Sequence, residues 1–244
     1  MFTSPHFIYL FISLATIAIA IFFLKNVKEK TRIIILRITS LLMLIIHLSP
    51  IVTRFFGQMF PLSGLDAVIW PIFFCNVSLW LFAITFLSPK VLKKLYPIVI
   101  NFAFIGGLLT LTFPQFHPNT TNIFDWFIFR SYLSHSLMLF GACFAYFSKE
   151  YQPRVKDIIT VFIGLISYLL WGIFTNYIFL TYKRYPVNSM YLQAPIFEGT
   201  VLYWHVDIVL VLLVTFTFFV LYEHFTLKKE NRTIYKLIKK ISKN

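Results

Sequence analysis

Apolar residues form long uninterrupted stretches along the chain, and short polar segments separate them. Seven stretches are candidate membrane spans: residues 7–24, 33–52, 65–87, 95–113, 126–147, 158–182 and 201–225. Each has about 18 to 25 residues, enough to cross roughly 30 Å of hydrocarbon at about 1.5 Å per residue. The pattern predicts an all-α fold, a polytopic membrane bundle of seven transmembrane helices within residues 1–225.

Basic residues lie unevenly between these stretches. Most of the 22 Lys and Arg residues fall in segments 25–32, 88–94, 148–157 and 226–244, and the alternate segments hold few. Basic loops remain on the inner side of a membrane, so we expect the N-terminus outside and the C-terminus inside. The net charge of +13 therefore indicates contact with an inner leaflet, and we expect no nucleic-acid partner.

The composition supports a membrane protein, because 59% of the residues are hydrophobic and only 13% are charged, against about 25% charged in soluble domains. No Lys or Arg precedes the first stretch, so we interpret it as a retained helix and not as a cleaved signal peptide. Cys75 and Cys143 both lie in apolar stretches, so we expect no disulfide, metal site or cofactor. The oligomeric state is not indicated.

The basic tail, residues 226–244, has its own apolar pattern. Ile234, Leu237, Ile238 and Ile241 recur at helical spacing with lysines between them. This pattern predicts a short interfacial helix on anionic inner-leaflet lipid. A simpler interpretation is a basic anchor that only sets the topology.

Residues 70–78, with the sequence WPIFFCNVS, place a thiol, an amide and a hydroxyl inside an apolar stretch. Polar groups at such depth are costly and usually face the interior of a bundle or a water-filled cavity. Cys75 is ten residues into a helix that runs inward, about 15 Å below the outer surface, and His135 is about 13 Å below that surface in another such helix. Both side chains then belong to the outer half of the membrane.

Further polar residues fall in the outer halves of the predicted spans. The candidates for a pocket are Asn76, Arg130, Ser134, Asn176, Tyr177, His205 and Asp207. We expect an outward-opening pocket, in which Asp207 pairs with Arg130 or His205. Each residue type also has a structural interpretation: a cysteine can be a small buried hydrophobe, an arginine can reach the headgroups, and an asparagine can join helices.

Four segments together resemble a known family. Residues 71–78 (PIFFCNVS) resemble the Pro-x-x-x-Cys-Asp-Ile-Ser segment of the YwaF family of bacterial integral membrane proteins, whose eukaryotic relative is transmembrane protein 164. Residues 133–137 (LSHSL) resemble its Leu-Ser-His-Gly-Leu, and residues 175–180 (TNYIFL) its Thr-Asn-Tyr-Met-Phe-Leu. Gly106-Gly107, followed by residues 111–114 (LTFP), resembles its Gly-Gly and Leu-Thr-Pro. The resemblance covers roughly residues 65 to 225 and implies a bacterial plasma membrane protein.

The resemblance implies a lipid acyltransferase or transacylase that acts on membrane phospholipid or lysophospholipid, with Cys75 and His135 as its essential pair. A histidine within hydrogen-bond reach can take the thiol proton as the sulfur attacks an ester carbonyl. The sequence differs from the family pattern at Phe73, where a polar residue is usual, and at Asn76, where the family has Asp.

By the same resemblance, Arg130 would hold the lipid phosphate, and Asn176 or Tyr177 would donate to the oxyanion. Two other functions are consistent with the polar residues alone: a small-molecule or ion transporter, and a membrane sensor without turnover. Neither of these requires a thiol nucleophile.

Overall fold

The computed structural model describes residues 4–55, 68–88, 90–113, 126–184, 186–195, 201 and 203–242. All regular elements within these ranges are helices. The long ones are α1 (Ser4–Leu24), α2 (Glu29–Phe55), α4 (Phe74–Leu87), α5 (Tyr96–Thr112), α6 (Trp126–Phe147), α7 (Ile158–Ile178), α8 (Trp204–Thr226) and α9 (Thr233–Ile241). The predicted all-α fold is confirmed for these residues.

Five helical segments are long and apolar enough to cross a membrane: His6–Leu24, Glu29–Val52, Lys93–Thr112, Val155–Lys183 and Trp204–Thr226. The chain is therefore a multi-pass membrane protein. Two of the seven predicted spans are not in this set. Helix α6 has 22 residues but includes Arg130 and His135, and α4 has only 14 residues.

The third predicted span, residues 65–87, is not one continuous helix where it is described. Residues 68–69 are helical, residues 70–73 are not, and α4 begins at Phe74. The prediction of a continuous helix was wrong because Pro71 disfavours the helical conformation of the residue before it and lacks a backbone N–H. Residues 65–67 lie outside the described part of the chain.

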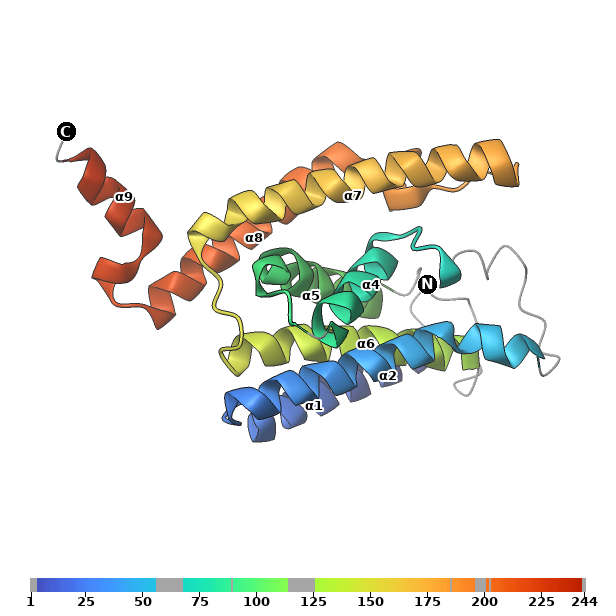
Figure 1. Cartoon of the computed structure of the whole chain (residues 1–244), viewed down its shortest axis with the longest axis horizontal. Helices are drawn as coiled ribbons and strands as arrows, with labels where there is room; N and C mark the ends of the chain where they lie inside the picture. The colour runs from blue at the N-terminus through green and yellow to red at the C-terminus, as the bar shows by residue number, and fades with distance from the viewer. Residues whose placement is uncertain are drawn as a thin grey trace. The chain divides into compact units, whose positions relative to one another are not determined.

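The packing divides the chain into two compact units, residues 1–151 and 152–244. In the first unit, α5 packs against both α4 and α6, and α6 also contacts α1 and α2 (Figure 1). The core of this unit includes Phe82, Phe102 and Met138, all fully buried. Helix α6 is thus the element of the unit that contacts most of the others.

Polar groups fasten one end of the first unit. Arg37 of α2 donates to the Phe86 and Ser88 carbonyls at the end of α4, at 3.1 and 3.2 Å. In the same unit, the buried carboxylate of Glu150 accepts a hydrogen bond from Tyr96. It also forms ion pairs with Arg32 and Lys93. The carbonyls that end α4 and the charges of the adjoining segments are therefore satisfied within the protein.

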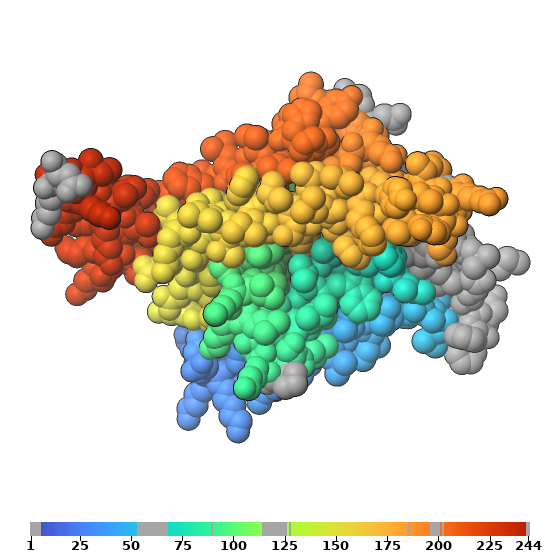
Figure 2. Space-filling model, turned by 45° about the horizontal axis from the view of Figure 1, so that its top comes forward, coloured from blue at the N-terminus to red at the C-terminus, as the bar shows by residue number. Residues whose placement is uncertain are grey.

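The second unit is built on α7 and α8, which contact each other. The chain after α7 returns along it, and a Cβ at Gly172 would lie within 3 Å of Met190 and Leu192. The tail forms α9, which is helical as the sequence pattern indicates. Figure 2 shows the tail as a lobe of its own at one end of α8.

The contact of α5 with α6 yields a test of the fold. A Cβ at Gly107 would lie 3.0 Å from the Leu139 backbone nitrogen and 3.1 Å from the His135 carbonyl oxygen. Gly107→Ala should lower the thermal stability of the purified protein, because overpacking costs about 1–3 kcal/mol and the better helix propensity of Ala returns only about 1 kcal/mol.

Gly106→Ala is the matched control on the same helix, because its Cβ would meet the flexible end of Met138 at 3.3 Å. It should unfold close to the wild-type temperature. A Gly107→Ala protein that unfolds at or above the wild-type temperature would show that the α5–α6 packing described here is wrong.

Candidate functional site

Cys75 is the second residue of α4, directly after the helix break. Phe73 is the N-cap in an extended conformation and provides no side-chain cap. The sulfur interacts with the backbone N–H groups of Cys75 and Asn76. The thiol also donates to Oδ1 of Asn76 at 3.4 Å. The positive end of a helix dipole favours a negative charge, so it offsets part of the cost that burial adds to forming a thiolate here.

The short length of α4 places its first turn inside the membrane. Fourteen residues rise about 21 Å, against a hydrocarbon core of roughly 30 Å. If α4 ends at the inner boundary of the membrane, Cys75 lies about 10 Å below the opposite boundary. This replaces the greater depth expected for a continuous helix.

Helix α5 provides the surface against which Cys75 lies. A Cβ at Gly106 would be 3.4 Å from Cα and 3.5 Å from Cβ of Cys75, so the two backbones are close. One turn along α5, the Thr110 side chain hydrogen-bonds with the Cys75 sulfur. Sequence reasoning missed Thr110, because a threonine in an apolar helix usually bonds to its own backbone.

His135 is buried in α6, with 8% of its surface exposed. Its Nδ1 lies 2.7 Å from the Ser131 carbonyl oxygen. A carbonyl only accepts, so Nδ1 carries the proton, and Nε2 is the basic nitrogen of the neutral ring. Among the described residues, Nε2 has no hydrogen-bond partner. The ring is therefore held in the tautomer that a general base requires.

The two candidate catalytic residues, Cys75 and His135, both contact α5 at its glycine pair. Gly106 faces Cys75, and Gly107 faces the carbonyl of His135. Cys75 and His135 therefore flank adjacent residues of α5. The Ser134 hydroxyl, also buried, donates to the Ser131 carbonyl at 3.0 Å and lies 3.5 Å from Nδ1 of His135.

Arg130 lies one turn before Ser134 on α6 and reaches α2. Its guanidinium donates to the His47 carbonyl at 3.2 Å. Its Nε is buried and has no partner among the described residues. The His47 ring donates from Nε2 to the Val68 carbonyl at 2.9 Å, just before the helix break. This arrangement leaves one buried guanidinium donor available for an anionic or carbonyl ligand.

The other four pocket candidates belong to the second unit. The Asn176 side chain accepts from the Ser189 backbone N–H at 2.9 Å, so it holds the returning chain on α7. Tyr177 is 59% exposed. His205 is exposed and stacks on Tyr203, and Asp207 Oδ2 is buried with no partner in the described part of the chain.

The predicted pairing of Asp207 with Arg130 or His205 is not among the ion pairs of the described residues. No group of three or more His, Cys, Asp or Glu side chains in those residues is arranged to hold a metal ion. The described site in the first unit therefore consists of a thiol, an imidazole, a guanidinium and short polar side chains.

The structure has helices of membrane-spanning length. It also has a Cys on α4 and a His on α6, and both of these helices pack against α5. These features define a class, the polytopic membrane proteins with polar groups buried between their helices. Within this class, the chain belongs to the TMEM164 family, whose sequence model matches residues 1–222. The resemblance noted from the sequence motifs is thereby confirmed. Neither the curated proteins nor the solved structures gave a match to the chain.

The position of Cys75 predicts a reactive thiol. Both cysteines are half-buried in apolar helices, but only Cys75 lies in the first turn of its helix. In a protein that retains only Cys75 (Cys143→Ser), a membrane-permeant maleimide should react on the order of ten times faster than in one that retains only Cys143 (Cys75→Ser).

The reaction is followed by intact-mass spectrometry in native membranes and again after unfolding. The two rates should become equal in the unfolded protein. Equal rates in the native protein would mean that the helix terminus and His135 do not activate the sulfur.

Proposed function

We propose that this protein transfers acyl chains between membrane lipids, with Cys75 as the nucleophile and His135 as the general base. One observation carries the proposal: Cα and Cβ of Cys75, on the first turn of α4, and the backbone carbonyl of His135, whose ring tautomer is fixed by Ser131, lie against the adjacent α5 glycines Gly106 and Gly107. A buried thiol is inert without a base and a stabilised anion. In this proposal His135 acts as the base, and the start of α4 stabilises the anion.

The first half-reaction forms a thioester. Nε2 of His135 takes the thiol proton while the Cys75 sulfur attacks the ester carbonyl of a donor phospholipid. The tetrahedral oxyanion collapses, the ester C–O bond breaks, and the leaving alkoxide takes the proton from His135. The positive end of α4 stabilises the oxyanion. Because the Asn176 amide nitrogen donates to the Ser189 carbonyl at 3.4 Å, and Tyr177 is exposed, α4 is a better candidate for this role than Asn176 or Tyr177.

The second half-reaction returns the enzyme to its starting state. Nε2 of His135 takes the proton of a lysophospholipid hydroxyl, and the hydroxyl oxygen attacks the thioester carbonyl. The C–S bond breaks, and the departing sulfur recovers the proton from His135. Arg130 Nε, buried and available, would hold the phosphate of either lipid.

A transporter remains the second candidate, because the helix break favours it. Helices that begin inside the membrane form substrate and ion sites in secondary transporters. Such a site would bind a ligand at the α4 terminus without covalent chemistry, so it would tolerate the loss of the thiol but not the loss of Arg130.

Two variants test acyl transfer. In lipid nanodiscs with a fluorescent-acyl phospholipid and a lysophospholipid, Cys75→Ser should abolish product formation and the hydroxylamine-sensitive acyl adduct. His135→Gln should reduce the rate about 10²–10⁴-fold, because the general base is lost. Cys143→Ser is the matched control and should retain wild-type turnover. Wild-type turnover in Cys75→Ser would exclude a thioester mechanism.

We also infer seven crossings in a bacterial plasma membrane, with the N-terminus outside and α9 at the inner leaflet. The five apolar spans, the shorter α4 and the more polar α6 supply the seven segments. The basic segments then lie on one side.

Reporter fusions test this topology. Green fluorescent protein fused after residue 242 should fluoresce, and alkaline phosphatase fused after residue 184 should be active, because the first folds in the cytoplasm and the second outside it. Active phosphatase after residue 242 would reverse the orientation.

A further inference from the structure

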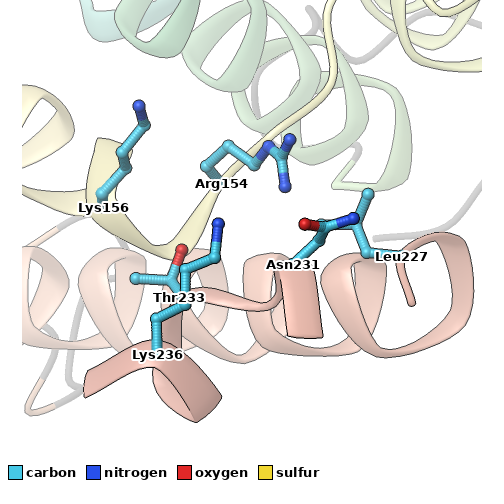
Figure 3. Close-up of a pocket in the computed structure, with 6 residues that line it drawn as sticks. All are labelled: Arg154, Lys156, Leu227, Asn231, Thr233 and Lys236. Atoms are coloured by element: carbon cyan, nitrogen blue, oxygen red, sulfur yellow. The ribbon is translucent and has the colours of Figure 1, made fainter. Parts of the chain in front are cut away.

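A basic pocket lies in the second unit, where the tail meets the segment before α7. Its volume is about 310 Å³, and it is lined by Arg154, Lys156, Leu227, Asn231, Thr233 and Lys236. Figure 3 shows Arg154 and Lys236 extending toward the same space from the two segments, while the Lys156 ammonium points away from it. Neither the proposed catalysis nor the family match accounts for this pocket.

The buried carboxylate of Glu223, near the end of α8, fixes the shape of the pocket. It accepts from the Val155 backbone N–H at 3.0 Å, and from the backbone N–H and hydroxyl of Thr233 at 2.7 Å each. Arg232 fastens the intervening turn by donating to the His224 and Leu227 carbonyls. The start of α9 is therefore joined to both the end of α8 and the turn before α7, and the basic side chains project from a fixed frame.

The cations that line the pocket outnumber the acidic groups near them, although Arg154 interacts electrostatically with Glu223. Among the described residues, neither Arg154 nor Lys236 forms an ion pair. The nearby Glu223 carboxylate already accepts three hydrogen bonds, and Asp157 accepts from the Arg154 backbone N–H at 3.1 Å. The pocket is lined by three basic residues and by no acidic one, so it keeps an excess of positive charge, which favours an anionic ligand.

Helix α9 indicates where such a ligand comes from. Ile234, Leu237, Ile238 and Ile241 form one apolar face, and each is 36–66% exposed. Thr233 lies on a flank of the helix, about 90° around its axis from the centre of that face, and Lys236 lies about 150° from it. When the apolar face is buried at the acyl boundary of a leaflet, Thr233 and Lys236 lie away from the acyl chains. The pocket that they line is then at the level of the headgroups.

We propose that this pocket binds the phosphate of an anionic lipid headgroup in the leaflet that α9 contacts. The guanidinium of Arg154 offers paired donors to two phosphate oxygens, and Lys236 provides a point charge from the opposite side. The lipid would link α9 to the turn before α7 and hold the tail against the membrane.

Binding of dansyl-phosphatidylglycerol to the full-length protein in neutral detergent micelles tests the proposal. Arg154→Gln with Lys236→Gln should weaken binding about tenfold or more, since two charge-assisted contacts are lost. Lys228→Gln with Lys239→Gln removes the same charge from residues outside the pocket and should change binding less than twofold. Arg154→Lys with Lys236→Arg keeps the charge and should restore most of the affinity.

Three further outcomes would overturn the proposal. An equal loss of lipid affinity in the pocket variant and in the control variant would mean that the lipid binds to a diffuse basic surface. Excess inorganic phosphate, at matched ionic strength, should displace the labelled lipid less well than unlabelled phosphatidylglycerol does. Equal displacement by the two would mean that the pocket is a site for free anions. Binding of phosphatidylcholine equal to that of phosphatidylglycerol would mean that headgroup charge is not recognised. Thermal unfolding of each variant confirms that the frame around Glu223 is intact.

Discussion

The helix break at residues 70–73 is the constraint from which the candidate site follows. In an apolar environment, backbone N–H and C=O groups must find partners within the protein. Here the His47 ring donates to the Val68 carbonyl before the break, and the Cys75 sulfur interacts with N–H groups after it. Val68 and Ile72 are buried, so the irregular backbone faces protein. The need to pair every backbone polar group makes such a break rare. Where the break occurs, the start of a new helix lies at the cysteine.

The polar side chains inside the first unit fall into two groups. Arg37 bonds to carbonyls at the end of α4, and Asn101 accepts from Tyr146 at 2.6 Å, joining α5 to α6. These residues complete the packing and leave little capacity for a ligand. His135 and Arg130 differ, because each uses one nitrogen for a backbone carbonyl and retains another without a described partner. This unused hydrogen-bond capacity makes the two residues candidates for a ligand site.

The sequence predicted the membrane class and the family, because these depend on composition and local motifs. It did not predict the start of α4 at Phe74, although the pair Trp70–Pro71 carried the signal, because a proline in a membrane helix is compatible with either a kink or a break. The contact of Asn176 with Ser189 and that of Thr110 with Cys75 join residues that are distant in sequence. Hydrophobic periodicity gives the face of a helix but not its neighbour, so only the packed structure reveals such pairs.

The small number of acidic residues explains why the basic pocket stays positive. The chain has nine Asp and Glu against 22 Lys and Arg. The two most buried carboxylates have structural partners: Glu150 pairs with Arg32 and Lys93, and Glu223 accepts from backbone N–H groups and a hydroxyl. Glu223 interacts electrostatically with Arg154, and the tail holds Glu230 beside seven Lys and Arg residues, so an excess of positive charge remains there. An excess of Lys and Arg over Asp and Glu orients a chain in a membrane. The same excess therefore also favours binding of anionic lipid at the membrane surface that the tail contacts.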